Sequence, residues 1–269
     1  MQKNGQKTRH KIVIGNWKMN PATVDHAKRI IVATKKTAQK LEHTSVVICP
    51  PFPFLGLALP ARANKHSVKT GTKTLQVGAQ NIFFEETGAF TGEVSATMLA
   101  DMGLSHVIVG HSERRKMGET DAVVAKKTIA VADVGMTAVI CIGEEHRDHE
   151  GAYLEHVKSS LKASLAGFSK KFVVEHRLII AYEPVWAIGA KEAMTASAIH
   201  EMEIFIKKVL SDMYGQDEAS SVPILYGGSV NFRNAAEIIR DGQVDGLLVG
   251  RESVNQQGFS ELLKEVDMA

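Results

Sequence analysis

The sequence predicts an α/β fold, a single (β/α)8 barrel of eight parallel strands ringed by helices. Short runs of aliphatic or β-branched residues alternate along the chain with longer segments whose apolar residues recur at three- and four-residue spacing. The runs are apolar on successive residues, as parallel strands are when both of their faces are buried. The length of 269 residues also suits such a barrel, which commonly takes about 250 residues.

Eight runs have the strand pattern, and six segments have the helical one. The predicted strands cover residues 12–14, 46–49, 75–79, 106–109, 137–141, 178–182, 222–226 and 246–249. The predicted helices cover residues 22–41, 96–102, 122–133, 152–165, 196–213 and 232–240. The strand pattern alone also fits an open, doubly wound sheet. The Gly-x-Gly-x-x-Gly turn that often follows the first strand of such a sheet is absent, and residues 15–20 read GNWKMN instead.

The chain divides into a short polar terminus and one domain. Residues 1–10 precede the first predicted strand and are polar and basic, so we expect a disordered N-terminal extension. No linker rich in proline, glycine or serine interrupts residues 11–269, which we interpret as a single barrel domain.

Composition and charge favour a small-molecule partner. Lysine and arginine total 32 against 30 aspartates and glutamates, and the net charge of +2 gives no strong field to attract nucleic acid or an anionic membrane. No apolar stretch approaches the roughly 18 residues of a membrane span. Cys49 and Cys141 are too few for a disulfide framework or a zinc site, so we expect a reduced, cytoplasmic protein without a metal.

In a barrel of this kind, the active site forms where the strands end at their carboxyl termini. Asn16 and Lys18 follow the first predicted strand, His111 follows the fourth, and Glu183 follows the sixth. Glycine-rich turns follow the seventh and eighth strands. These side chains are far apart in the sequence, but barrel closure would bring them to one rim.

Four segments resemble the signature segments of the triosephosphate isomerase family. They read GNWKMN at residues 15–20, GHSERR at 110–115, AYEPVWAIG at 181–189 and YGGSV at 226–230, and they occur in the family's order. Weaker matches, including CIGE at residues 141–144, extend the similarity over nearly the whole chain. The resemblance implies a TIM barrel of glycolysis and gluconeogenesis that needs no cofactor. Its reaction would interconvert dihydroxyacetone phosphate and D-glyceraldehyde 3-phosphate through an enediolate.

The resemblance also implies roles for the residues at the rim. Glu183 would be the general base, and His111 would be the electrophile that polarises the carbonyl. The family is the standard illustration of a glutamate base working with a neutral histidine. Lys18 would supply a fixed positive charge and Asn16 a hydrogen bond to the developing oxyanion, and both would contact substrate. His111 directly precedes a predicted helix start, whose amides disfavour a cationic imidazole, so we expect its pKa to be low.

Several neighbours of these residues are expected to support them. Glu113 would pair with Lys18, and Ser112 would lie beside His111. Tyr226, Gly227 and Gly228 would shape the turn after the seventh strand.

Phosphate should be bound mostly by backbone amides, because glycines let the chain approach an oxyanion closely. We expect these contacts at Gly189, Ser229 and Gly250, with a further amide from Arg251. The family usually has a second glycine where this chain has Arg251, which narrows the backbone conformations available there.

A lid over the phosphate is the other feature that the resemblance implies. Its residues would be Pro184, Val185, Trp186, Ala187, Ile188, Gly189, Ala190, Lys191, Glu192, Ala193 and Met194. The family's usual Gly-Thr-Gly-Lys-Thr-Ala is GAKEAM here, at residues 189–194, and a tip glycine is replaced by Lys191. We still expect closure, because the first hinge and Gly189 are retained.

The segment of residues 80–93 after the third strand is longer than most connections and is therefore a functional candidate. In the family this segment enters the partner subunit. The resemblance thus implies a homodimer with Thr91 and Glu93 at its interface, near Asn16 and Lys18.

Two alternative functions stay open from the sequence. A related barrel isomerase of four-carbon sugar phosphates would use the same proton chemistry with a different pocket beyond the carbonyl. A catalytically silent phosphate-binding protein would keep the barrel but lose a catalytic residue, whereas Glu183, His111 and Lys18 are all present.

Overall fold

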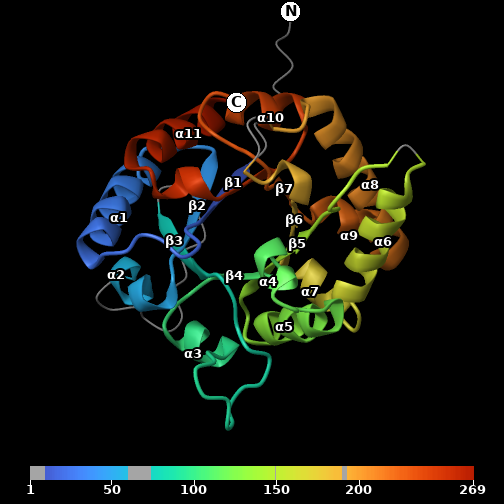
Figure 1. Ribbon diagram of the computed structural model, residues 1–269, viewed down its shortest axis with the longest axis horizontal. Helices are drawn as coiled ribbons and strands as arrows, with labels where there is room; N and C mark the ends of the chain where they lie inside the picture. The colour runs from blue at the N-terminus through green and yellow to red at the C-terminus, as the bar shows by residue number, and fades with distance from the viewer. Residues whose placement is uncertain (1–9, 60–73, 149, 190–192) are drawn as a thin grey trace, which may run out of the picture.

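The computed structural model describes residues 10–59, 74–148, 150–189 and 193–269. Eight strands form a closed barrel in which every neighbouring pair is parallel and β1 also pairs with β8 (Figure 1). The strands are β1 (Lys11–Asn16), β2 (Thr44–Cys49), β3 (Leu75–Ala79), β4 (His106–Val109), β5 (Thr137–Ile142), β6 (Leu178–Tyr182), β7 (Ile224–Tyr226) and β8 (Gly246–Val249). The predicted (β/α)8 barrel is therefore confirmed, and the open sheet is excluded.

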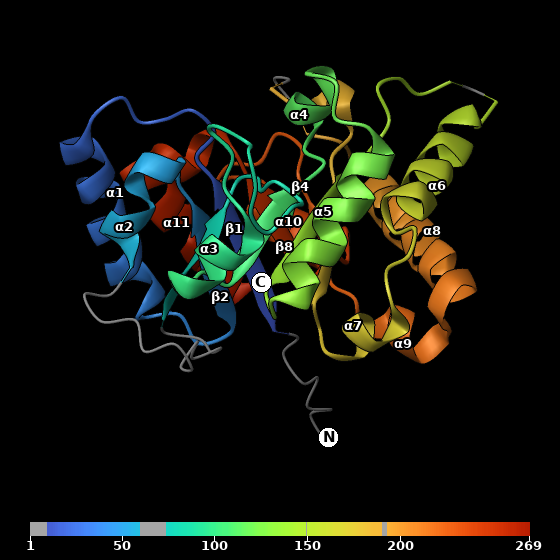
Figure 2. The same cartoon turned by 90° about the horizontal axis from the view of Figure 1, so that it is seen from below.

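Helices surround the barrel on its outside (Figures 1 and 2). The longer ones are α1 (Val24–Ala38), α5 (Asp121–Asp133), α6 (Ala152–Ser164), α8 (Ala196–Tyr214), α10 (Ala235–Asp241) and α11 (Gln256–Met268). The short ones are α2 (Leu55–Ala58), α3 (Ala96–Asp101), α4 (Ser112–Lys116), α7 (Lys170–Val174) and α9 (Gln216–Ser221). Three 3-10 turns complete the set: η1 (Phe52–Phe54), η2 (Val185–Ala187) and η3 (Arg251–Val254).

Side-chain hydrogen bonds to the backbone explain where two helices depart from their predicted starts. Thr23 accepts a hydrogen bond from the amide of His26, so α1 begins after it rather than at residue 22. The helix predicted at residues 232–240 starts later, at Ala235. The cause is a turn in which the Asn231 side chain accepts from the Arg233 amide and the Asn234 side chain accepts from the Asn231 amide.

We did not predict α11, although it buries an apolar stripe against the barrel.

The core has two layers, because successive strand residues point to opposite faces. The inner layer contains strand residues only and fills the barrel. Its members are Ile14, Val47, Cys49, Ile108, Val139, Cys141, Ile179, Ala181, Leu225 and Leu248. The outer layer joins the alternate strand residues, such as Val13 and Ile180, to helix residues such as Ile199 and Val131. Burial on both faces accounts for the uninterrupted apolar runs in the sequence.

Among the described helices, none combines the length and apolarity that a membrane crossing requires.

One partly buried histidine makes the stability of the barrel sensitive to acid. His106 opens β4 and its Nδ1 lies 2.7 Å from Ser105 Oγ. Burial lowers the pKa of His106 to about 4. Between about pH 6.5 and 4, the unfolded chain therefore takes up a proton that the folded chain does not. The contribution of His106 to the free energy of unfolding is fully present above pH 6.5. It is lost as the pH falls through this window and amounts to about 3 kcal/mol.

We predict that His106→Gln flattens the pH dependence of stability between pH 7 and 4. Urea unfolding at a series of pH values measures the effect as the change in free energy of unfolding per pH unit. His156 on α6 is exposed and provides the control, since His156→Gln should leave the slope as it is in the parent chain. An equal slope in the parent chain and in His106→Gln would contradict the prediction.

Candidate active site

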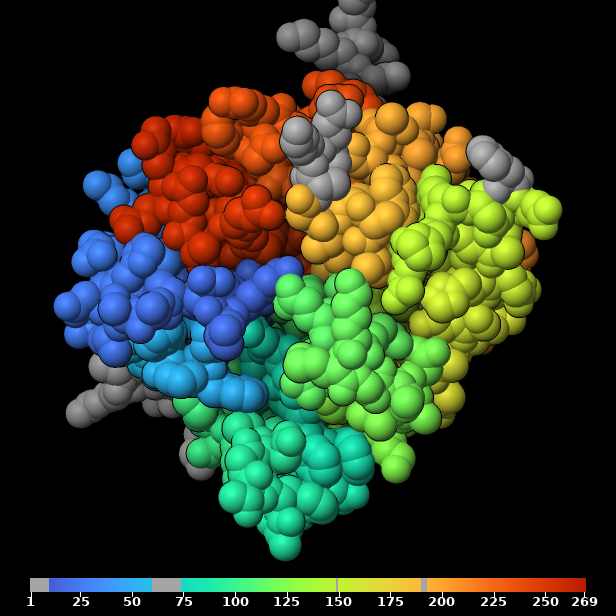
Figure 3. All heavy atoms as spheres, viewed as in Figure 1, coloured from blue at the N-terminus to red at the C-terminus, as the bar shows by residue number. Residues whose placement is uncertain are grey.

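A cavity of about 560 Å³ opens at the carboxyl ends of the strands. Figure 3 shows this face, on which segments from both halves of the chain meet around the centre. The lining residues are Asn16, Trp17, Lys18, Asn20, His111, Glu183, Ile188, Gly189, Gly227, Gly228, Ser229, Val230, Asn231, Leu248, Gly250, Arg251, Glu252 and Val254. All of the predicted catalytic and phosphate-contacting residues are in this set, so the closed barrel brings them together.

The end of β1 holds a cation in a fixed position. Lys18 has a φ of 53°, a left-handed conformation that is unusual for a residue with a side chain. Two side chains stabilise it: Asn16 Oδ1 accepts from the Lys18 amide at 3.0 Å, and Gln80 Nε2 donates to the Lys18 carbonyl at 2.8 Å. The Lys18 ammonium lies 2.7 Å from Glu113 Oε1. Backbone strain of this kind is typical of functional sites, where surrounding contacts maintain it.

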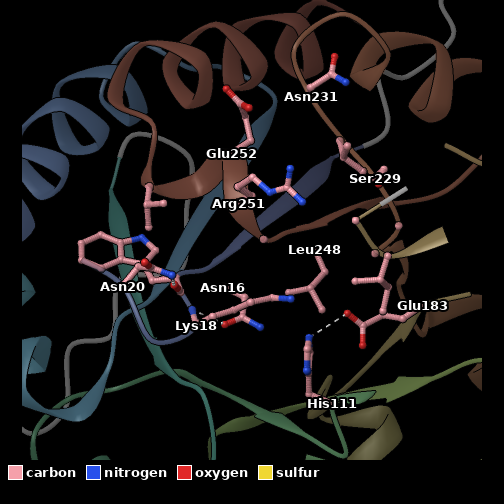
Figure 4. Close-up of a pocket in the computed structure, with 18 residues that line it drawn as sticks. Asn16, Lys18, Asn20, His111, Glu183, Ser229, Asn231, Leu248, Arg251 and Glu252 are labelled. Carbon is pink, nitrogen blue, oxygen red and sulfur yellow. Dashed lines mark hydrogen bonds and ion pairs between the residues drawn. The ribbon is translucent and has the colours of Figure 1, made fainter. Parts of the chain in front are cut away.

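His111 is buried at the start of α4, where its side chain caps the helix. Its Nδ1 accepts a hydrogen bond from the Glu113 amide at 3.2 Å, and its Nε2 lies 3.2 Å from Glu183 Oε1 (Figure 4). A ring nitrogen that accepts from an amide carries no proton, so this geometry assigns the proton of a neutral ring to Nε2. That proton points into the cavity, toward Glu183.

The structure changes one expectation for His111. Burial lowers its pKa, but the carboxylate of Glu183 raises it more, and the resulting pKa is above the usual value. The low pKa that we expected from the helix start therefore does not apply while Glu183 faces the ring. The sequence could not reveal this interaction, because the two residues approach each other only in the closed barrel.

Glu183 follows β6 and is only 3% exposed. Burial raises the pKa of its carboxyl group, but His111, the Cys141 thiol and Lys18 together lower it more, so that the carboxylate form is favoured. Its second oxygen, Oε2, is buried and has no hydrogen-bond partner among the described residues. Gly227 leaves room for this side chain, since a Cβ there would lie 2.6 Å from Glu183 Cγ. A buried carboxylate oxygen without a partner is costly unless it serves a ligand or a proton transfer.

The opposite side of the cavity is formed by glycines and η3. A Cβ on Gly250 would lie 3.3 Å from the Lys18 Cε, so the lysine stem passes directly over the backbone there. Ser229 Oγ donates to the Ala187 carbonyl at 2.9 Å, which connects the turn after β7 to the turn after β6. Gly189 and Arg251 complete this side.

A buried glutamate that we did not single out connects the predicted lid to the barrel. Glu144, two residues after the end of β5, is 1% exposed. Its Oε1 accepts from Trp186 Nε1 at 3.0 Å, from the Tyr182 hydroxyl at 2.9 Å and from Arg147 Nε at 3.0 Å. Its one signal in the sequence was a weak match, CIGE, directly after a buried strand.

The far end of the predicted lid is also tied down, because the Tyr226 hydroxyl accepts from the Met194 amide at 3.1 Å. Ala190, Lys191 and Glu192 lie outside the described residues, so the substitution at the tip has no structural account here.

Other predicted residues do not line the cavity. Ser112 is buried beside His111 and lines a neighbouring cavity of about 480 Å³. Thr91 and Glu93 are exposed in the segment between β3 and α3. Cys141 is buried in the inner core beside Glu183, and burial together with the Glu183 carboxylate raises the pKa of its thiol well above the usual value.

Comparisons with known proteins agree with the geometry of the cavity. A sequence model of the family described as triosephosphate isomerase matches residues 11–266. A triosephosphate isomerase of Dehalococcoides mccartyi is 38% identical over 258 residues, which cover 94% of this chain and 95% of the relative. A triosephosphate isomerase of Moorella thermoacetica is 38% identical over 257 residues, or 95% of this chain and 98% of the relative.

We predict that Glu183→Gln lowers the pKa of His111 below 6.5, because it removes the negative charge that raises this pKa and leaves burial, which lowers it. A titration of the ring followed by NMR measures the effect. Glu113→Gln is the matched control, because Glu113 is the weakest of the causes that raise this pKa and its loss should lower it less. A His111 pKa that did not change in Glu183→Gln would show that the two side chains are not coupled.

Proposed function

The chain belongs to the triosephosphate isomerase family, and we propose that it interconverts dihydroxyacetone phosphate and D-glyceraldehyde 3-phosphate in this cavity. One observation carries the proposal. The unpaired Oε2 of Glu183 lies in a cavity that Lys18 and His111 also line. A base, a hydrogen-bond donor and a cation are the groups that proton transfer beside a carbonyl requires.

Glu183 would take the proton from the carbon next to the carbonyl group and return it to the neighbouring carbon. Its low pKa keeps it as a carboxylate at neutral pH, ready to accept a proton. Burial keeps water away from the carboxylate, and in a site that excludes water the electrostatic interactions are stronger.

The negative charge of the enediolate would be stabilised from the other side of the substrate. The Nε2 proton of His111 and the ammonium of Lys18 both face the cavity, and Asn16 lies beside them (Figure 4). The Lys18 ammonium is held by Glu113, so it needs little reorganisation when charge develops. Substrate bound between Glu183 and His111 would also separate the pair and remove the cause of the raised His111 pKa.

Backbone at Gly189, Ser229 and Gly250 would bind the phosphate, and residues 184–194 would close over it. The two described ends of this lid are anchored by hydrogen bonds, Trp186 to Glu144 and Met194 to Tyr226. Closure would exclude water from the enediolate, which limits side reactions of the intermediate.

We further propose that the chain works as a homodimer in the cytoplasm, as part of glycolysis and gluconeogenesis. The segment between β3 and α3 projects from the barrel (Figure 1) and exposes Phe90 by 43%, together with Thr91 and Glu93. Gln80, at the start of this segment, supports the Lys18 carbonyl. A partner subunit that covers the segment would therefore also stabilise the catalytic lysine.

The proposed reaction is tested by an assay of Glu183→Asp against the parent chain with glyceraldehyde 3-phosphate, coupled to the reduction of dihydroxyacetone phosphate. Aspartate keeps the carboxylate but withdraws it by one methylene. Misplacement on this scale costs on the order of a hundredfold, which should appear in kcat.

Two outcomes would oppose the proposal. A variant that turned over within about twofold of the parent would exclude Glu183 as the base. A parent enzyme that preferred erythrulose phosphates to triose phosphates would instead point to a four-carbon substrate.

For the dimer, we predict that Thr91→Arg shifts the chain from dimer to monomer and lowers kcat, since it places a large charge in the proposed interface. Analytical ultracentrifugation measures the mass, and the coupled assay measures kcat. Ser159 on α6 is exposed and serves as the control, so Ser159→Arg should stay dimeric. A monomeric parent chain at micromolar concentration would exclude the proposed assembly.

A further inference from the structure

The phosphate side of the cavity contains a guanidinium group in addition to backbone amides. Arg251 is the first residue of η3, directly after Gly250, and its side chain lines the cavity. A Cβ built on Gly189 would lie 3.5 Å from Arg251 Nη2. The side chain thus extends from the turn after β8 to the turn after β6, and Figure 4 shows it pointing toward Ser229.

The charge of Arg251 is not neutralised within the described part of the chain. Arg251 and Lys18 both line the cavity, and Lys18 is paired with Glu113. None of the ion pairs among the described residues includes Arg251. The adjacent Glu252 accepts a hydrogen bond from Asn255 Nδ2 and points away from the guanidinium in Figure 4.

We propose that the guanidinium of Arg251 binds the phosphate group of the substrate directly. This inference rests on the proposed function, and it extends our sequence-based expectation, which gave Arg251 a backbone role only. A guanidinium presents a planar fork of donors that matches two oxygens of a phosphate, and such charge-assisted pairs are strong. A Cβ at Gly189 would be in ordinary van der Waals contact with Nη2, so the fork lies directly beside the Gly189 backbone.

The position of Arg251 also predicts which kinetic constant it controls. The phosphate is not a reacting group, and its charge is the same in the ground state and in the transition state. A contact that is equally strong in both states acts on substrate binding, so its loss should raise KM more than it lowers kcat. This separates Arg251 from Glu183, His111 and Lys18, which contact the reacting atoms in the proposed mechanism.

The test uses Arg251→Gln, which keeps most of the length of the side chain but removes its charge, and Arg251→Lys, which keeps the charge without the fork. Binding of inorganic phosphate is measured by calorimetry, and KM and kcat are measured in the coupled assay. We expect Arg251→Gln to raise both the Kd of phosphate and KM by about tenfold or more, with kcat within about threefold of the parent. Arg251→Lys should recover part of the loss. Arg251 is exposed, so these substitutions leave the core intact, and a thermal melt checks this.

Arg233→Gln is the matched control, because Arg233 is an exposed arginine in the turn after β7 that does not line the cavity. The inference is overturned if Arg251→Gln leaves the Kd of phosphate unchanged, or if Arg233→Gln weakens phosphate binding as much. A fall in kcat equal to that in kcat/KM would also overturn it. Calorimetry with phosphate requires no turnover. A chain that binds phosphate through Arg251 but does not isomerise triose phosphates would therefore disprove the proposed function separately.

Discussion

Closure of the barrel by the hydrogen bonds between β1 and β8 is the constraint on which the active site depends. The parallel pairing aligns Ile12 with Gly246 and Gly15 with Val249. It brings the first and last strands together, so that Lys18 passes over Gly250. An open sheet made of the same strands would leave these residues at opposite edges. The inner core layer fills the closed barrel below the cavity, which makes the rim above it a rigid support for side chains.

This rigid support allows charges to be buried that would be costly elsewhere. Glu183 and Glu144 are both almost completely buried at strand ends, yet they are satisfied differently. Both oxygens of Glu144 accept hydrogen bonds, as expected of a residue with a purely structural role. Glu183 has one oxygen near His111 and one without a partner among the described residues. The difference in hydrogen bonding distinguishes a carboxylate that holds the fold from one that is available for chemistry.

Much of the fold and of the cavity could be predicted from the sequence, because both depend on local patterns. Burial on two faces produces uninterrupted apolar runs, and all eight predicted runs overlap strands of the barrel. The residues directly after the strands were therefore found. The interactions that depend on three-dimensional proximity were not, such as the effect of Glu183 on the His111 pKa and the contacts of Glu144 with Trp186. The late start of α10 was missed for a different reason, since its asparagine turn competes locally with the helix.

The proposed phosphate site combines two ways of binding an anion, and they place different demands on the chain. Backbone amides hold an anion with no side-chain entropy to lose, but they require glycine-rich turns, which the chain has at Gly189 and Gly250. A guanidinium adds full charge and a fork of donors, but ordering a long side chain costs entropy. At Arg251 this cost is reduced, because the side chain already lies between two anchored turns, β8 to η3 on one side and the Ser229 contact with Ala187 on the other. The Arg251 side chain lies beside the Gly189 backbone and lines the cavity without closing it.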